Sequence, residues 1–240
     1  MRVRLALIPL VAAAALLAGC ATATPTPTPT STGPADNGVS ALAPADMLAK
    51  TQAALAAAKS YHVVGTLTES GQKVGFDLRF SGKDVTGTID AGVFKLEVIG
   101  VGNDVYLKAP DAFWSSQIPA AQASTFLALI KGKYVKVDSN NATYAELSQS
   151  FKPENMVKPT PPLTKGDTKT IDGQPAVAIV DKTGGKVYIA TTGEPVPLSI
   201  EDNPASGTNG SIQFKEYNLP VLITAPAAGD VFDLKALMGS

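Results

Sequence analysis

The chain has 240 residues and a formal net charge of −1; 45% of its residues are hydrophobic and 17% are charged. This length suits one large β-rich domain or two small ones, and the apolar fraction is enough to build a sizeable core. A nucleic-acid partner would need a strongly basic surface, so the near-neutral charge excludes nucleic acid from the expected partners.

The N-terminus predicts a lipoprotein signal peptide over residues 1–19. Arg2 and Arg4 precede an almost uninterrupted apolar run over residues 5–18. This run is shorter than the roughly 20 residues that a membrane-spanning helix needs, as is typical of a signal peptide. It ends in the sequence Leu-Ala-Gly-Cys, which resembles the bacterial lipobox, and Cys20 is the only cysteine of the chain.

Cys20 is therefore expected to carry acyl groups such as palmitate and to become the first residue of the mature chain. Acylation would anchor the chain in the outer leaflet of a cell membrane, on the extracytoplasmic side. The alternative is a plain cleaved signal peptide. Residues 20–43 are predicted to be the lipidated cysteine and a tether, because alternating Thr and Pro over residues 21–34 favour an extended polyproline conformation.

Residues 44–59 predict the first helix. Pro44 suits the first helical position, Asp46 complements the helix dipole in the first turn, and Lys59 complements it in the last.

Between residues 61 and 108, short runs alternate apolar and polar residues. Such a two-residue period places each apolar set on one face of a pleated sheet. The turns between the runs leave room only for hairpins, so we expect an antiparallel sheet with one apolar and one polar face. Gly65 and Gly87 fall inside strands, where glycine permits sharp bends that would curl the sheet into a half-barrel.

The second half of the chain predicts further helices and strands. Phe113 and Trp114 are expected at a rim or corner, and residues 152–162, with four prolines, form an expected loop. The predicted helices span residues 120–131 and 144–151. The predicted strands span residues 134–137, 168–171, 176–181, 186–190, 196–201, 211–217 and 221–224.

Together these elements predict an α+β fold. It consists of a strongly curved antiparallel sheet of about eleven strands, a half-barrel, with two or three helices over its concave face. We expect a single domain over residues 44–240, because no second Thr/Pro-rich linker divides them.

Catalytic and metal-binding chemistry is not expected. One histidine and one cysteine cannot form a His/Cys metal cluster, and no G-x-S-x-G nucleophile motif occurs. His62 lies out of phase with the apolar residues of its strand, so we expect it to face water. Glu201 and Asp202 are adjacent and are expected in a solvated turn rather than as an acid–base pair. The chain is therefore predicted to have no cofactor, no metal and no enzymatic activity.

The apolar face of the sheet carries the main functional hypothesis. A bent sheet of about eleven strands has a concave side wider than two thin helices can fill, and the remaining space can accept a lipid tail. The alternative is a core that its own side chains fill completely. The residues expected to line the lipid cavity are Leu48, Leu55, Val63, Leu67, Val74, Phe76, Leu78, Phe80, Phe94, Leu96, Val98, Val105, Leu107, Phe126 and Ile130.

Several short motifs, taken together, point to a family. They are the lipobox with its Thr/Pro tether, the helix end over residues 58–62, the stretches 102–109 and 113–114, and the later stretches 187–189, 193–198 and 221–226. In these motifs the chain resembles actinobacterial lipoproteins of the LppX/LprG type and, more distantly, LolA/LolB-like carriers.

The resemblance implies a membrane-anchored half-barrel that encloses a pocket for acylated lipid or glycolipid in transit through the cell envelope. It implies no catalytic residue. It also implies that the protein is a monomer and that an envelope transporter or acceptor protein is its partner. The alternative function is an envelope sensor or scaffold that uses the same fold to bind a protein, through an exposed apolar patch at Phe113 and Trp114.

Overall fold

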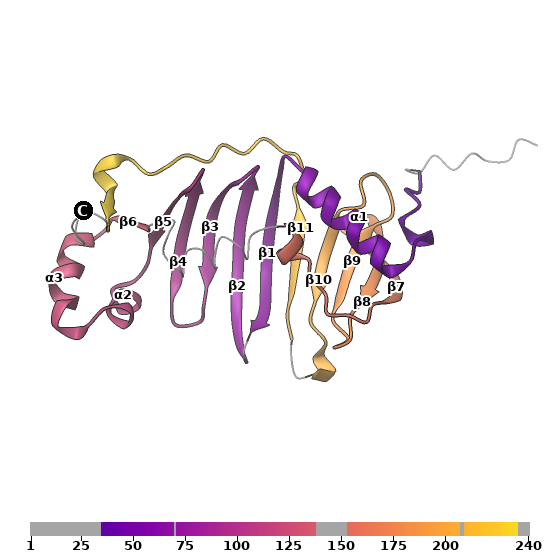
Figure 1. The fold of residues 1–240 in the computed structure, drawn as a ribbon, viewed down its shortest axis with the longest axis horizontal. Helices are drawn as coiled ribbons and strands as arrows, with labels where there is room; N and C mark the ends of the chain where they lie inside the picture. The colour runs from indigo at the N-terminus through magenta and orange to yellow at the C-terminus, as the bar shows by residue number, and fades with distance from the viewer. Residues whose placement is uncertain (1–34, 70, 138–152, 207–208, 235–240) are drawn as a thin grey trace, which may run out of the picture. The chain divides into compact units, whose positions relative to one another are not determined.

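The computed structural model describes residues 35–69, 71–137, 153–206 and 209–234, which contain a twelve-stranded sheet (Figure 1). The strands are β1 (Ser60–Glu69), β2 (Gln72–Ser81), β3 (Asp84–Asp90), β4 (Lys95–Val101), β5 (Asp104–Lys108), β6 (Tyr134–Val137), β7 (Thr164–Ile171), β8 (Gln174–Val180), β9 (Lys186–Ala190), β10 (Pro197–Glu201), β11 (Ser211–Lys215) and β12 (Val231–Asp233). Their order in the sheet is β12-β6-β5-β4-β3-β2-β1-β11-β10-β9-β8-β7.

Helices in the described part of the chain flank this sheet. They are α1 (Pro44–Ala57), α2 (Asp111–Gln117), α3 (Ala120–Ile130) and α5 (Pro153–Met156), with 3₁₀ turns η1 (Val39–Ala41), η2 (Pro204–Ser206) and η3 (Ala228–Asp230). Helix α1 begins at Pro44 with Asp46 in its first turn, as the sequence predicts. None of the described helices combines the length and the apolarity needed to cross a bilayer.

The predicted fold class is confirmed: the sheet is curved and mainly antiparallel, and helices lie over its concave face. The sheet has twelve strands where about eleven are predicted. One of them, β12, is not predicted, and it pairs in parallel with β6 through Phe232 opposite Val135. The first helix lies within a few residues of its predicted bounds, and β1 to β5 occupy residues 60–108, where alternation predicts the strands.

The strand predicted at residues 221–224 is wrong. These residues carry no regular secondary structure, although Leu222 is 89% exposed and Ile223 is buried. Alternating burial does not make a strand unless a neighbouring strand pairs with the backbone, and residues 219–227 instead run along the ends of the strands between β11 and β12 (Figure 1).

Two smaller expectations also differ. Phe113 and Trp114, expected at a rim or corner, lie in helix α2 at one end of the sheet, and Trp114 is buried, so it offers no exposed patch to a protein partner. Helix α5 forms one turn inside the expected loop over residues 152–162. The helix predicted at residues 144–151 lies outside the described residues.

Strand register confirms that the predicted apolar sets share one face of the sheet. Directly opposed residues in an antiparallel pair point to the same side. The opposed apolar pairs include Val63–Leu78, Leu67–Val74, Phe76–Ile89, Ile89–Leu96 and Val98–Leu107, which continue one apolar face from β1 to β5.

Two glycines inside the strands have backbones that other residues rarely adopt. Gly65 and Gly87 have φ values of +139° and +147°. A Cβ atom at Gly65 would lie 2.2 Å from the Ser211 carbonyl oxygen, and one at Gly87 would lie 1.9 Å from that of Asp77. Neighbouring strands therefore approach closely at both positions, as expected where a sheet bends.

Gly87→Ala is expected to destabilise the fold by at least about 2 kcal/mol, because it adds both backbone strain and a clash with β2. Urea denaturation would measure this loss. Gly229→Ala is the matched control, since a Cβ there meets nothing within 4 Å; it should change stability by less than about 0.5 kcal/mol. Equal effects of the two substitutions would contradict the close approach at Gly87.

Candidate functional site

Helix α1 lies over one end of the apolar face (Figure 1). Met47 and Leu55 are fully buried in the same core as Val177 and Ile179 of β8. The core begins before the helix, because Val39 of η1 is also buried in it. This end of the sheet is therefore closed by protein side chains.

Helices α2 and α3 cover the opposite end of the same face. Trp114, Phe126 and Ile130 form a second buried cluster with Val135 of β6. Edge-to-face aromatic contacts run through this cluster, with ring centroids 5.2 Å apart for Phe113–Trp114 and 5.8 Å for Trp114–Phe126. Such contacts fix the two short helices against β5, β6 and β12.

The middle of the apolar face is less completely covered by the described helices, whose main contacts lie at its two ends. Five large apolar side chains there are only half-buried, and we call them the central apolar strip. They are Leu67, Val74, Phe76, Leu96 and Leu107. The strip lies across β1, β2, β4 and β5, and it is the part of the face most accessible to a ligand.

The fifteen predicted lining residues thus separate into two groups. Eight are buried: Leu55, Val63, Leu78, Phe80, Val98, Val105, Phe126 and Ile130. Seven are half-buried, namely the central apolar strip together with Leu48 and Phe94. Period-two alternation finds the face, but it cannot show which members other elements cover. That all fifteen line one lipid cavity stays a prediction.

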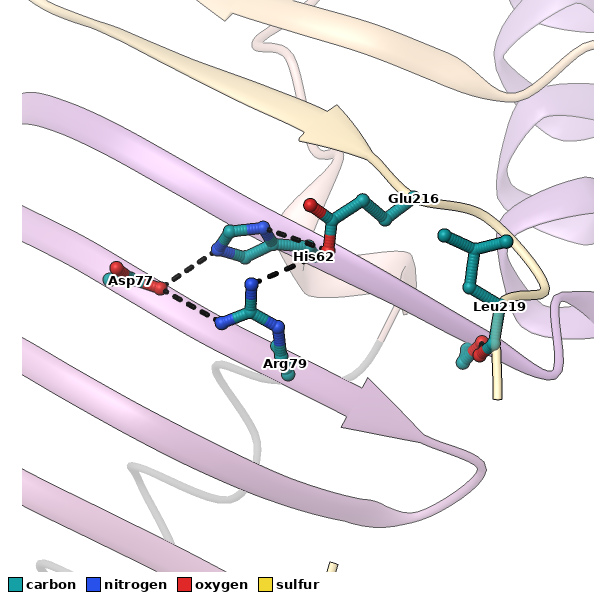
Figure 2. Close-up of polar contacts among 6 residues, drawn as sticks. His62, Asp77, Arg79, Glu216 and Leu219 are labelled. Carbon is teal, nitrogen blue, oxygen red and sulfur yellow. Dashed lines mark hydrogen bonds and ion pairs between the residues drawn. The ribbon is translucent and has the colours of Figure 1, made fainter. Parts of the chain in front are cut away.

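The opposite, polar face of the sheet corrects the expectation for His62. Its side chain does lie on this face, but it is buried (6% exposed) rather than in contact with water. Nε2 donates to Asp77 Oδ1 at 2.8 Å, and Nδ1 lies 3.4 Å from Glu216 Oε2 (Figure 2). Arg79 lies beside both carboxylates, 3.4 Å from Glu216 and 3.7 Å from Asp77.

His62 is buried because charged neighbours from three segments close over it. Arg79 of β2 and Lys215 of β11 are its cross-strand partners, and Glu216 follows β11 with a left-handed φ of 57°. His62 Nδ1 is a buried nitrogen without a hydrogen bond in the described residues, since its approach to Glu216 is not aligned for one. The sequence offered no sign of this cluster, because Glu216 is distant along the chain.

Two open pockets lie at the ends of the strands. One, of about 650 Å³, lies beside the end of α1 and is lined by Ala57, Lys59, Tyr217 and Asn218, among others. Burial raises the pKa of the Tyr217 phenol, whose hydroxyl donates to the Pro197 carbonyl at 2.6 Å. This phenol is therefore a neutral structural group.

The second pocket, of about 420 Å³, contains the adjacent carboxylates Glu201 and Asp202. Glu201 is paired with Lys169, and Asp202 accepts a hydrogen bond from the Thr68 backbone at 3.0 Å. Both carboxylates thus connect segments that are not adjacent in the sheet: Glu201 of β10 reaches β7, and Asp202 reaches β1. Within the described residues, no three His, Cys, Asp or Glu side chains are grouped so as to hold a metal ion.

The strands and the strip define a curved half-barrel with a partly open apolar face, and comparison with solved structures finds chains that are similar over most of their length. The chain is similar to LprF from Mycobacterium bovis at 16% identity and a TM-score of 0.48, over 77% of this chain and 97% of that one. It is similar to lipoprotein LppX from Mycobacterium tuberculosis at 15% identity and a TM-score of 0.45, over 75% and 99%. An uncharacterised conserved protein from Thermus thermophilus matches at 10% identity and a TM-score of 0.42, over 79% and 98%.

LppX belongs to the family that the sequence motifs resemble. No protein-family model and no curated protein matches the chain. At these identities and TM-scores the likeness concerns the fold, and no ligand or role follows from it.

His62→Ala is expected to lower the free energy of unfolding by about 2 kcal/mol. It removes a buried ring, and Asp77 and Glu216 lose the imidazole nitrogens that lie against their carboxylates. The urea midpoint measured at constant m value reports this loss. Lys215→Ala is the control, since Lys215 is the cross-strand neighbour of His62 and is only half-buried. It should cost less than about 0.5 kcal/mol. A solvent-facing His62 would instead make the two losses equal.

Proposed function

We propose that this chain is an envelope lipoprotein, anchored through Cys20, that binds acylated lipid or glycolipid against the central apolar strip and carries it between membranes or proteins of the envelope. The observation that supports the proposal is the strip itself, five large apolar side chains held half-exposed on four strands of a curved sheet. Apolar surface that a fold leaves accessible in one place is typical of a ligand or partner site.

An extended acyl chain matches the strip in shape and chemistry. Leu67 opposes Val74 across β1 and β2, while Leu96 and Phe76 both oppose Ile89 of β3. These contacts make a continuous hydrocarbon surface across β1 to β4. A sixteen-carbon chain buried there would gain about 12 kcal/mol at ~0.8 kcal/mol per methylene, before the cost of ordering the chain.

Helices at both ends of the face support a carrier rather than a catalyst. The clusters under α1 and α2–α3 hold the sheet in its curved form, so the strip does not depend on the ligand for its shape. The polar groups with defined partners, such as His62 and Glu201, lie on the other face or at a strand end. The strip thus offers burial and no reacting group.

Native mass spectrometry of the full chain is the direct test, and co-purified acylated lipid is expected. Leu96→Asp should weaken binding of a fluorescent fatty acid at least about tenfold, because it puts a charge against the alkyl chain. Ile99→Asp is the matched control: Ile99 is equally half-buried on β4 but opposes Thr86, on the polar face. It should leave the affinity within about twofold.

Thermal unfolding of both variants shows whether a loss of binding reflects a loss of fold. Ligand-free protein that binds no fatty acid, or equal weakening by Leu96→Asp and Ile99→Asp, would contradict a lipid site on this face. If the protein binds no lipid but captures a protein partner, the scaffold function is favoured instead.

A further inference from the structure

The segment after β11 exposes two leucines at one end of the sheet. The large apolar residues that stand exposed among the described residues are Val93, Leu129, Leu219 and Leu222. Leu219 is 53% exposed and Leu222 is 89% exposed, and only two residues separate them. Both belong to the stretch that runs past the ends of the strands between β11 and β12 (Figure 1).

This exposure is held in place by the fold. The Asn218 backbone N–H donates to the Ser60 carbonyl at 2.8 Å, and the Lys59 N–H donates to Asn218 Oδ1 at 2.8 Å. Ser60 Oγ donates to the Leu219 carbonyl, and the segment begins at Glu216, which lies against Arg79 and His62 (Figure 2). Hydrogen bonds of Asn218 and Leu219 therefore fix the segment at Leu219 to the start of β1.

Two lysines lie close to Leu219 at the start of β1. Lys59 follows α1, and its carbonyl accepts a hydrogen bond from Gly82 at 2.9 Å, which brings the β2–β3 turn with Lys83 alongside. Lys59 and Lys83 are exposed and make no ion pair with the described residues. The nearby Asp84 accepts a hydrogen bond from the Gly102 backbone at 2.8 Å.

We propose that this end of the sheet, formed by Lys59, Lys83, Leu219 and Leu222, docks onto an anionic lipid bilayer. Leucines insert into the interfacial region of a bilayer, and lysine stems lie along it while their ammonium groups reach the phosphates. A protein partner is the less favoured occupant, because unpaired lysines are depleted in protein–protein interfaces.

The docked orientation has a consequence for the neighbouring pocket. Lys59 and Asn218 also line the 650 Å³ pocket beside α1, so docking brings its opening to the lipid surface. The central apolar strip lies toward the other end of the strands, since Leu67 and Val74 are near the β1–β2 turn. The docking surface is thus independent of the proposed lipid site, and either can fail without the other.

Site-directed labelling of the full chain tests the docking surface. Leu222→Cys and Val93→Cys place an environment-sensitive fluorophore at equally exposed positions at opposite ends of the sheet, because Val93 (84% exposed) lies in the β3–β4 turn. Vesicles of phosphatidylcholine, with and without phosphatidylglycerol, provide the surface. The parent chain, whose only cysteine is Cys20, shows how much fluorophore is attached at Cys20. Any membrane binding by residues 1–34 is the same in all variants.

The probe at Leu222 should shift to shorter wavelength on anionic vesicles and be quenched by nitroxide-labelled lipid, while the probe at Val93 should not respond. Adding Lys59→Glu and Lys83→Glu together to Leu222→Cys should weaken this response at least about tenfold in lipid concentration. An unresponsive Leu222 probe, or an equal or stronger response at Val93, would overturn the proposal. A crosslink from Leu222 to an envelope protein, without any vesicle response, would assign the surface to a protein partner.

Discussion

One constraint governs this fold: most of the large apolar side chains of β1 to β5 point to one side of the sheet, and that side must be shielded from water. Exposed apolar surface costs about 25 cal/mol per Å², so a face this wide requires extensive covering. Helix α1 covers one end and α2–α3 cover the other. The half-buried central apolar strip is what remains between them.

Curvature and covering depend on each other. Gly65 and Gly87 let neighbouring strands approach so closely that no side chain fits, and the sheet bends there. A bent sheet has a concave face on which short helices can reach the strands at both ends. The convex face carries a smaller buried cluster around Tyr188 and Leu198, and polar groups beside it pair with one another. Lys186 donates to Asp167 at 2.6 Å and holds the pKa of that carboxyl below its usual value.

The segment that follows β11 links the two faces of the molecule. Glu216 reaches over the polar face to His62 and Arg79, and two residues later Asn218 is bonded to the start of β1. Both residues adopt left-handed backbone, with φ of 57° and 60°, which only a well-anchored chain tolerates outside glycine. The same anchoring that buries His62 therefore presents Leu219 and Leu222 to the surroundings.

Local pattern was sufficient to determine the first helix, the hairpin strands and the antiparallel sheet, because a period of two and a short turn are properties of adjacent residues. Alternation also placed the apolar sets of β1 to β5 on one face of the sheet, as the strand register shows. Tertiary structure alone decided the parallel pairing of β12 with β6, the burial of His62 and the irregular path of residues 221–224. Each of these depends on a contact between residues far apart in the chain, and no local spacing encodes such a contact.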